Sequence, residues 1–174
     1  MINPVPERTI NYRVYDEFNA LYGIATVDLP DIESMSDTIS GAGIAGEVES
    51  PTLGHFGTME LVLNWRTITP EAARLSAQRA HHLELRGSQQ IYDAGMGEIL
   101  TQSVRIVTRS APKNLSLGSF EVGSTTDSSS TFEVNFLKIY LGGRPTLEID
   151  KYNFRFVVDG VDYLANVRRD LGME

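Results

Sequence analysis

The stretch that decides the fold is TFEVNFLKIYL (residues 131–141), followed by Gly142-Gly143 and then by PTLEID (residues 145–150). β-Branched and aromatic residues dominate both runs, which predicts two strands. Two consecutive glycines supply the positive φ angles of a primed turn, so the strands are expected to pair as an antiparallel hairpin. FRFVV (residues 154–158) predicts a third strand, and Asp159-Gly160 a second corner. Residues 162–170 are expected to make one or two helical turns that end at Gly172.

Short β runs separated by Gly, Pro, Asp and Ser recur upstream of this hairpin. In MELVLNWR (residues 59–66) the apolar side chains alternate with polar ones, which predicts a half-buried strand. Residues 19–27, 81–86 and 99–109 are further predicted strands, the first with Leu21, Gly23, Ala25 and Val27 on one face. Thr69 followed by Pro70 marks the start of a short helix. The expected fold is a mainly β (α+β) domain, an antiparallel sandwich or barrel-like structure with one or two short helices.

Two segments lack any apolar periodicity. Residues 31–57 are rich in Gly, Ser and Glu and are expected to form a long loop, which in a compact domain is either functional or disordered. The Ser/Thr-rich residues 124–130 predict a mobile polar loop. No internal repeat is visible, and 174 residues suit a single domain.

The amino-acid composition argues against several classes of function. The net charge of −8, with 15 basic and 23 acidic residues, argues against tight nucleic-acid binding, which needs Lys and Arg to neutralise phosphates. The absence of cysteine excludes disulfides, thiolate nucleophiles and zinc sites that need sulfur. The N-terminal residues lack the basic segment and apolar core of a secretory signal, and no stretch has the apolar length of a membrane helix. We therefore expect a chain that is made and kept in the cytoplasm until something else releases it.

One motif matches a nucleotide-binding fingerprint literally: GAGIAG (residues 41–46). That fingerprint functions only between a strand and a helix N-terminus, and here Glu47 and Glu49 place carboxylates where a pyrophosphate would lie. We interpret the motif as a flexible loop. His81 and His82 would point to opposite faces of a strand, and His55 is isolated, so no metal site is expected. No pattern of a catalytic nucleophile is present, and we expect neither catalytic residues nor a cofactor.

Three other groups of residues have a functional and a structural reading. Glu148 and Asp150 share a strand face and could be an acid/base couple, but a solvated or interfacial acidic face is the favoured reading. Arg168 and Arg169 beside Leu171 are read either as a solvated helix end or as a contact with acidic residues of another subunit. A set of aromatic residues that could form a carbohydrate platform, or else core or interface, comprises Tyr12, Tyr15, Phe18 and Tyr22.

The order of several segments resembles the major tail tube protein of contractile-tailed bacteriophages and R-type pyocin-like particles. The segments are VDLPDI (27–32), GAGIAG (41–46), the strand from Met59, the Gly142-Gly143 hairpin, LEID (147–150), DGVD (159–162) and RRDLG (168–172). The most specific part is Glu-Ile-Asp followed by Asp-Gly-Val-Asp and a closing Arg-x-x-Leu-Gly. The resemblance covers residues 14–172, although residues 67–86 and 124–130 depart from it.

The resemblance implies subunits that form hexameric rings, with hairpins of neighbouring subunits building one inner β-barrel. Rings would stack into a hollow tube that sheath contraction drives through the target envelope and that conducts DNA or ions. The implied partners are further copies of the chain, the tail sheath, tape-measure, baseplate and tail terminator proteins, with DNA passing through the lumen without specific binding. The implied location is the virion, after assembly in the bacterial host cytoplasm, without membrane insertion by the tube protein itself. The acidic balance suits a lumen from which DNA must slide freely, because fixed positive charge would hold phosphates.

Within a single tail-tube domain (residues 1–174), we expect an N-terminal arm (1–18) and an extended inter-ring loop (about 31–57) to be disordered before assembly. The residues expected at subunit interfaces are Gly41, Ala42, Gly43, Ile44, Arg168, Arg169 and Leu171. Exposed strand edges would then pair in the ring instead of causing aggregation. Alternative readings are the tube protein of a type VI secretion-like system, a soluble β-sandwich binding module and an enzyme built on the glycine motif.

Overall fold

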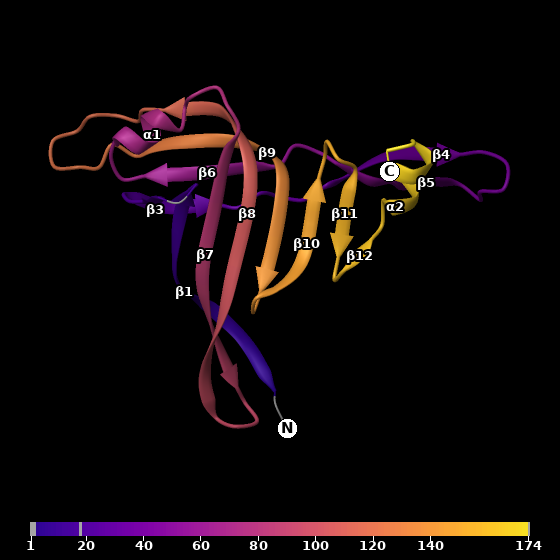
Figure 1. Ribbon diagram of the computed structural model, residues 1–174, viewed down its shortest axis with the longest axis horizontal. Coiled ribbons are helices and arrows are strands. Elements are labelled where there is room, and N and C mark those ends of the chain that lie inside the picture. The colour runs from indigo at the N-terminus through magenta and orange to yellow at the C-terminus, as the bar shows by residue number, and fades with distance from the viewer. Residues whose placement is uncertain (1–2, 18, 174) are drawn as a thin grey trace.

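The computed structural model describes residues 3–17 and 19–173 and consists mainly of antiparallel strands (Figure 1). The strands are β1 (Pro4–Asp16), β2 (Asn19–Leu21), β3 (Ile24–Asp28), β4 (Ser34–Ser40), β5 (Glu47–Phe56), β6 (Glu60–Trp65), β7 (His81–Asp93), β8 (Glu98–Ser116), β9 (Ser128–Leu141), β10 (Arg144–Asp150), β11 (Arg155–Val158) and β12 (Val161–Asp162). The helices are α1 (Pro70–Arg74) and α2 (Ala165–Asp170). Neither of these helices, within the described ranges, has the length and apolar character needed to cross a membrane.

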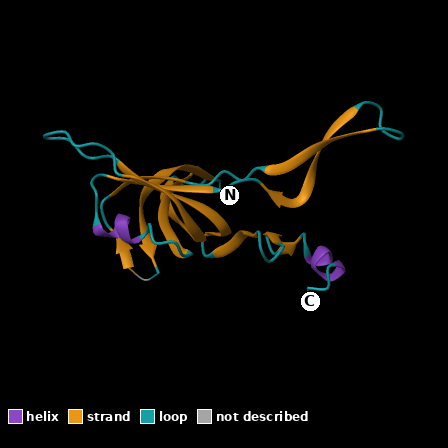
Figure 2. Cartoon of the chain, turned by 90° about the horizontal axis from the view of Figure 1, so that it is seen from above, coloured by secondary structure: helices purple, strands orange, loops and turns teal. Residues whose placement is uncertain are grey.

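Ten of the strands form one sheet with the hydrogen-bonded order β12-β11-β10-β9-β8-β7-β1-β2. Strand β6 joins β9 from outside this path and carries β3 on its other side. Seen from above, the strands of this sheet overlap in two layers at one end, while the hairpin β4–β5 projects from the other end (Figure 2). The structure confirms the predicted mainly β, sandwich- or barrel-like fold with short helices.

Strand β9 belongs to both layers because a β-bulge at Asn135 interrupts its alternation. The register between β8 and β9 shifts there by one residue, and the buried side changes from Val134 to Leu137. The backbone N–H of Val134 donates to the carbonyl of Met59, next to β6, whereas the carbonyl of Asn135 accepts from Lys151, next to β10. The neighbour of β9 therefore changes at the bulge, which is how strands turn from one layer into another.

The core lies under β6, as its alternation predicts. Met59, Leu61, Leu63 and Trp65 are all buried. They pack in one apolar cluster with Leu83, Leu85, Ile106, Phe132, Val134, Leu137 and Ile149. The indole N–H of Trp65 donates to Ser130 Oγ at 3.0 Å, so the one polar atom of this side chain is satisfied inside the core.

Both glycine turns of the C-terminal third have the predicted geometry. Gly142 and Gly143 have φ angles of 56° and 80°, and β9 pairs with β10 across them. At the next corner Asp159 and Gly160 have φ angles of 47° and 83°, and β11 pairs with β12. Positive φ at both central positions matches the right-handed twist of the flanking strands, so these turns fix the register of the hairpins.

The helix and strand predictions for the middle of the chain are also confirmed. The Thr69 side chain accepts from the backbone N–H of Ala72 at 3.2 Å, and Pro70 occupies the first turn of α1. The predicted strands at residues 81–86 and 99–109 lie within the longer β7 and β8, which pair along the whole length of β7. Together they form the long ribbon at the bottom of Figure 1.

The prediction of an irregular loop over residues 31–57 is wrong, because this segment is the two-stranded hairpin β4–β5. The glycine-rich residues 41–46 are its turn. Ile39 lies opposite Val48, yet both are about half exposed. Since neither face of the hairpin is covered, no buried face imposes the apolar alternation by which a strand is recognised in a sequence.

A single strand over residues 19–27 is also wrong. The chain breaks between β2 and β3 at Gly23, which has a φ angle of 85° and accepts a hydrogen bond from the backbone of Arg66 at 2.9 Å. The expected common apolar face does not form, since Leu21 is buried and Ala25 is exposed. Positive φ turns the chain from β1 toward β6, and glycine adopts this conformation without steric cost.

Two predicted irregular segments are partly regular. Residues 128–130, predicted to belong to a mobile loop, begin β9, and Ser128 and Ser130 are buried beside the core. Within the N-terminal arm, residues 4–16 form β1 and pair with β7. Residues 1, 2 and 18 lie outside the described ranges. At the start of β9, the small hydroxyl side chains of Ser128 and Ser130 leave room for Trp65, so a polar sequence is compatible with burial there.

The core assignment predicts the effect of a truncation. Leu63→Ala should lower the free energy of unfolding by about 2–5 kcal/mol, because it removes a fully buried side chain and leaves a cavity. Val62→Ala, on the opposite and half-buried face of β6, is the matched control and should cost less. Denaturant unfolding followed by the fluorescence of the single tryptophan measures both. Equal losses would show that β6 does not face the core as described.

The bulge at Asn135 predicts a larger effect on folding than the truncation of Leu63. Deleting Asn135 shifts one half of β9 by one residue and turns its buried side chains to solvent, so the variant should lose cooperative unfolding. Asn135→Ser keeps the residue count and should stay within about 1 kcal/mol of the unaltered protein. Circular dichroism during thermal unfolding distinguishes the two. A deletion variant with a normal transition would contradict the role of the bulge.

Candidate subunit-interface surfaces

The two groups of predicted interface residues lie toward the same end of the molecule. Gly41, Ala42, Gly43 and Ile44 form the turn of the hairpin β4–β5, which we call the arm (residues 34–56). Arg168, Arg169 and Leu171 belong to α2 and the residues that follow it. In Figures 1 and 2 the arm and α2 both lie at the right, and α1 and β3 at the left. The fold thus gathers segments more than a hundred residues apart in sequence.

The base of the arm is fixed to the C-terminal strands and helix. The rings of Phe56 and Phe156 stack edge-on with centroids 5.0 Å apart. A Cβ atom added to Gly54 would lie 2.5 Å from Cδ1 of Leu164, so the Leu164 side chain packs directly on the backbone of the arm. The φ of Gly54 is 68°, a conformation that glycine adopts without steric cost. These contacts hold the arm at a defined direction from the main sheet.

Beyond its base the arm exposes apolar side chains. Met35, Ile39, Val48 and Leu53 are each about half exposed. An isolated two-stranded hairpin is only marginally stable in water and gains stability from a covering surface. The arm therefore has the character of a segment that contacts another molecule.

The turn of the arm does not have the geometry of a nucleotide site. Its glycines Gly41, Gly43 and Gly46 all have positive φ, and the N–H of Ile44 donates to the carbonyl of Gly41 at 3.1 Å. The turn leads into a strand, β5, and not into a helix. Because no helix N-terminus follows the motif, there is no dipole and no row of free N–H groups to receive a pyrophosphate. The interpretation of the fingerprint as a non-nucleotide turn is supported.

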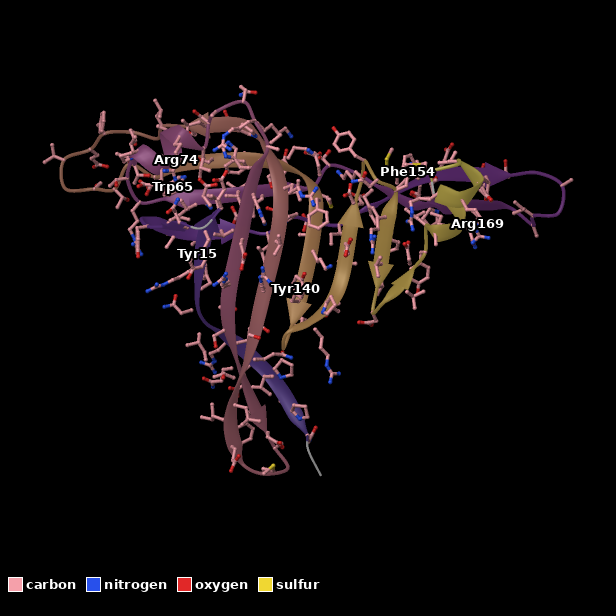
Figure 3. All side chains as sticks on the ribbon, viewed as in Figure 1. Tyr15, Trp65, Arg74, Tyr140, Phe154 and Arg169 are labelled. Atoms are coloured by element: carbon pink, nitrogen blue, oxygen red, sulfur yellow. The ribbon has the colours of Figure 1, made fainter. Side chains whose placement is uncertain are left out.

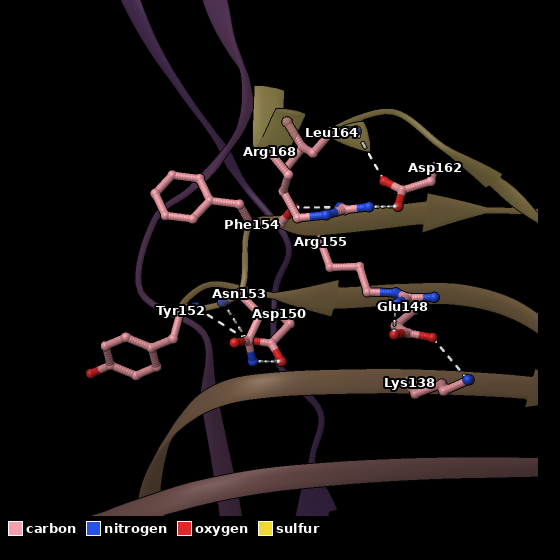
Figure 4. A network of polar contacts seen from close by, with 10 residues as sticks. All are labelled: Lys138, Glu148, Asp150, Tyr152, Asn153, Phe154, Arg155, Asp162, Leu164 and Arg168. Carbon is pink, nitrogen blue, oxygen red and sulfur yellow. Dashed lines mark hydrogen bonds and ion pairs between the residues drawn. The ribbon is translucent and has the colours of Figure 1, made fainter. Parts of the chain in front are cut away.

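Arg168 makes its contacts inside its own chain (Figure 4). Its guanidinium donates to Asp162 Oδ2 at 2.8 Å and to the carbonyl of Phe154 at 2.9 Å. The hydrogen bond from Arg168, followed by that from the N–H of Leu164, lowers the pKa of Asp162. This network ties α2 to β11 and β12. Of the three predicted residues at this end, Arg169 and Leu171 are the ones on the exposed side.

Glu148 and Asp150 serve structural roles and do not form a catalytic pair (Figure 4). Glu148 lies between Lys138 and Arg155, with N–O distances of 2.8 Å to each. The hydrogen bond to Glu148 raises the pKa of Lys138. Asp150 accepts from the backbone N–H of Asn153 at 3.0 Å and so closes the turn after β10. Both carboxylates are mostly buried and internally paired, so a solvated face is wrong, whereas an interfacial face stays a prediction.

The face of the sheet opposite the core carries a second charged network, which includes Tyr15 and Tyr140, both labelled in Figure 3. Glu84 accepts from Arg86 at 2.5 Å and from Arg105 at 2.7 Å. The Arg86 guanidinium lies 4.7 Å above the ring of Tyr15, and that of Arg105 lies 5.2 Å from the ring centroid of Tyr140. The hydrogen bond from Arg105 is the main reason that the pKa of Glu84 is lowered. Ion pairs and cation–π contacts together order this face across four strands.

The histidines do not converge. His81 is buried, with Nε2 3.0 Å from the carbonyl of Ala77, and His82 is exposed on the other face of β7, as predicted. His55 is exposed on the arm. Across residues 3–17 and 19–173, no group of three or more His, Asp or Glu side chains is arranged to hold a metal ion.

The aromatic residues near the N-terminus are dispersed. Tyr12 packs against the core and donates from its hydroxyl to the carbonyl of Ala25 at 3.2 Å. Tyr15 lies under Arg86, and Tyr22 is 71% exposed. Phe18 is outside the described residues. The described members of the set therefore have separate structural roles, and nothing they form favours a carbohydrate platform.

The sequence reading missed one exposed apolar segment. The loop between β8 and β9 carries Leu117, Phe120 and Val122, and Phe120 is 89% exposed. It projects at the left of Figure 1, opposite the arm. Isolated apolar residues among Gly, Ser and Thr have no periodicity, so only their size could have singled them out.

The Glu84 network predicts a pH dependence. Because the folded-state pKa of Glu84 lies below its ordinary value of 4.5, its charge stabilises the fold above that pH. The contribution is lost as the pH falls through the depressed pKa. Between pH 6 and pH 3 the free energy of unfolding should therefore fall less in Glu84→Gln than in the unaltered protein. Urea unfolding at each pH tests this, with exposed Glu121→Gln as the control that should follow the unaltered protein. Identical pH profiles for all three proteins would contradict it.

Comparison with known proteins finds matches along most of the chain. The sequence profile of the family described as phage tail tube protein FII matches residues 6–172. The tail tube protein of Escherichia phage P2 is 26% identical over 158 residues, which are 87% of this chain and 88% of that protein.

Solved structures show the same fold at low sequence identity. The sheath/tube terminator of an extracellular contractile injection system (PVC) matches with a TM-score of 0.52 at 13% identity, over 75% of this chain and 94% of that one. A chain of the PVC sheath–tube complex matches with a TM-score of 0.51 at 12% identity, over 74% and 87% of the two chains. With a family profile that spans nearly the entire sequence and a fold shared with these structures, the chain belongs to the phage tail tube protein FII family.

Proposed function

We propose that copies of this chain form hexameric rings that stack into the hollow inner tube of a contractile injection particle. The observation that carries the proposal is the arm, a projecting hairpin whose apolar side chains are exposed. Among the described residues, strands β12, β2 and β3 each pair with only one neighbour, so the main sheet also has open edges. Open edges bind further strands, and a closed ring of identical subunits can satisfy them all without unlimited aggregation.

In this proposal residues 1–174 act as one tail-tube domain with two segments that reach neighbouring subunits. Within residues 1–18, β1 joins the main sheet, and its first residues extend away from the sandwich (Figure 1). Residues 31–57, which contain the arm, make contacts between subunits and rings. Gly41, Ala42, Gly43, Ile44, Arg169 and Leu171 are proposed to lie at these contacts, with Arg168 holding α2 in place behind them.

The proposed mechanism is mechanical. A sheath surrounds the tube, and its contraction drives the tube through the target envelope, so no covalent step and no catalytic residue is required. The known structures with this fold come from a sheath–tube complex and a sheath/tube terminator, which supports a sheath and a terminator as partners. We extend the proposal to tape-measure and baseplate proteins, with assembly in the cytoplasm of the bacterial host.

We also propose that the lumen conducts DNA or ions without binding DNA specifically. The net charge of −8 supports this, because binding to DNA rests mainly on Lys and Arg side chains that neutralise phosphates. Acidic side chains lining the lumen would repel phosphates and let DNA slide.

The role of the arm in assembly can be tested by removing it. A variant in which residues 35–55 are replaced by a short Gly-Ser turn should remain folded, because the core cluster does not include the arm beyond Phe56. It should stay monomeric where the unaltered protein forms rings and tubes. Analytical ultracentrifugation and negative-stain electron microscopy measure assembly, and Trp65 fluorescence reports that the core is intact.

Thr38→Ser keeps the arm and is the matched control, so it should assemble normally. Rings formed equally well without the arm would remove the arm from the proposal. An unaltered protein that stays monomeric at high concentration would contradict the proposed function itself.

A further inference from the structure

The net negative charge of the chain comes from the segment that contains the arm. Residues 14–65 contain nine Asp or Glu and no Lys or Arg. Five of the acids lie between residues 31 and 49: Asp31, Glu33, Asp37, Glu47 and Glu49. None of these five forms an ion pair with another described residue. The arm therefore carries negative charge that its own chain does not compensate.

A cleft with the opposite character lies at the other end of the molecule. It has a volume of about 250 Å³ and is bounded by β1, β2 and β3, with Ala20, Tyr22 and Ala25 on its walls. Arg13 and Arg66 also line it. Within the described part of the chain neither arginine has a carboxylate at ion-pair distance. Two arginines without an ion-pair partner among the described residues thus line the same cleft.

The strands on both sides of the prospective contact have unpaired edges. At the cleft, within residues 3–17 and 19–173, β2 pairs only with β1, and β3 pairs only with β6. In the arm, β4 and β5 pair only with each other. A strand edge presents a row of free N–H and C=O groups, and an incoming extended segment can pair with it.

We propose that the arm of one copy docks along the cleft between β2 and β3 of the next copy, with Glu47 and Glu49 facing Arg13 and Arg66. This inference rests on the proposed function and names the two surfaces that meet. Glu47 and Glu49 are two residues apart on one strand and point to the same side, as the contact requires. A space of about 250 Å³ admits side chains from one strand edge, and the rest of the arm stays outside the cleft.

The positions of the two surfaces fit a ring. The arm lies toward the right end of the longest axis of the molecule, and β3 lies toward its left end (Figure 1). A contact between opposite ends is head-to-tail, and a repeated head-to-tail contact forms a ring when the rotation between successive copies closes. Charge pairs of this kind also orient approaching subunits, and salt screens them.

Charge reversal tests the contact. The pair Glu47→Lys with Glu49→Lys should abolish rings at low salt, and so should the pair Arg13→Glu with Arg66→Glu, because each places like charges face to face. Combining all four changes restores opposite charges and should recover rings. Glu121→Lys, on the exposed loop at residues 117–127, is the control and should assemble normally.

Either pair of reversals assembling like the unaltered protein would overturn the inference while leaving the proposed function intact. Failure of the fourfold variant to recover rings would overturn it as well. Tubes that form normally in these variants but no longer bind sheath protein would assign the arm to the sheath and also overturn it.

Cross-linking gives a second readout that does not depend on complete tubes. The chain has no cysteine, so Thr38→Cys in the arm and Tyr22→Cys at the cleft each introduce a single thiol. Oxidising a mixture of the two variants should yield a disulfide-linked dimer that contains one copy of each. The control pair, Thr38→Cys with Met96→Cys at the exposed tip of the β7–β8 ribbon, should not cross-link. Equal yields from the two mixtures would overturn the proposed docking.

Discussion

The structure depends on one strand that must satisfy its backbone hydrogen bonds in two layers. β9 pairs with β8 along one side, and along its other side first with β6 and then with β10. The extra residue Asn135 makes this possible, since it turns the later side chains inward after the neighbour has changed. Without that switch, either Phe132 or Leu137 would face water. The core and the extended C-terminal sheet therefore share a single element.

This shared strand also determines what remains available for assembly. The core lies at one end of the molecule, and the sheet continues through β10, β11 and β12 to the other end, where Arg168 and Asp162 fix α2. The arm is attached there through the contact of Phe56 with Phe156, and its apolar side chains farther out are about half exposed. A fold with its core at one end and an exposed hairpin at the other is suited to a repeating assembly. Membership in the tail tube family gives that assembly its biological setting.

Sequence reasoning succeeded where one physical signal was strong. Alternation at Leu61, Leu63 and Trp65 predicted their burial, and positive φ at Gly142 and Gly143 followed from the residue type. It failed where the usual signals are absent or misleading. The arm has no buried face, so it has no apolar periodicity, and the serines at the start of β9 are polar yet buried beside a tryptophan. The role of the candidate interface residues stays a prediction, and one of them, Arg168, is bound inside its own chain.

By itself, the sequence determined the fold class, the C-terminal hairpins, the strand at residues 59–66, the capped helix and the absence of thiol chemistry, because each follows from local residue types and spacing. Only the tertiary structure decided which acids are paired, where the chain crosses between layers, and that the arm and the cleft containing Arg13 and Arg66 lie at opposite ends. Those properties come from contacts between residues far apart in the chain. Local propensity does not encode such contacts, because they exist only once the whole sheet has closed.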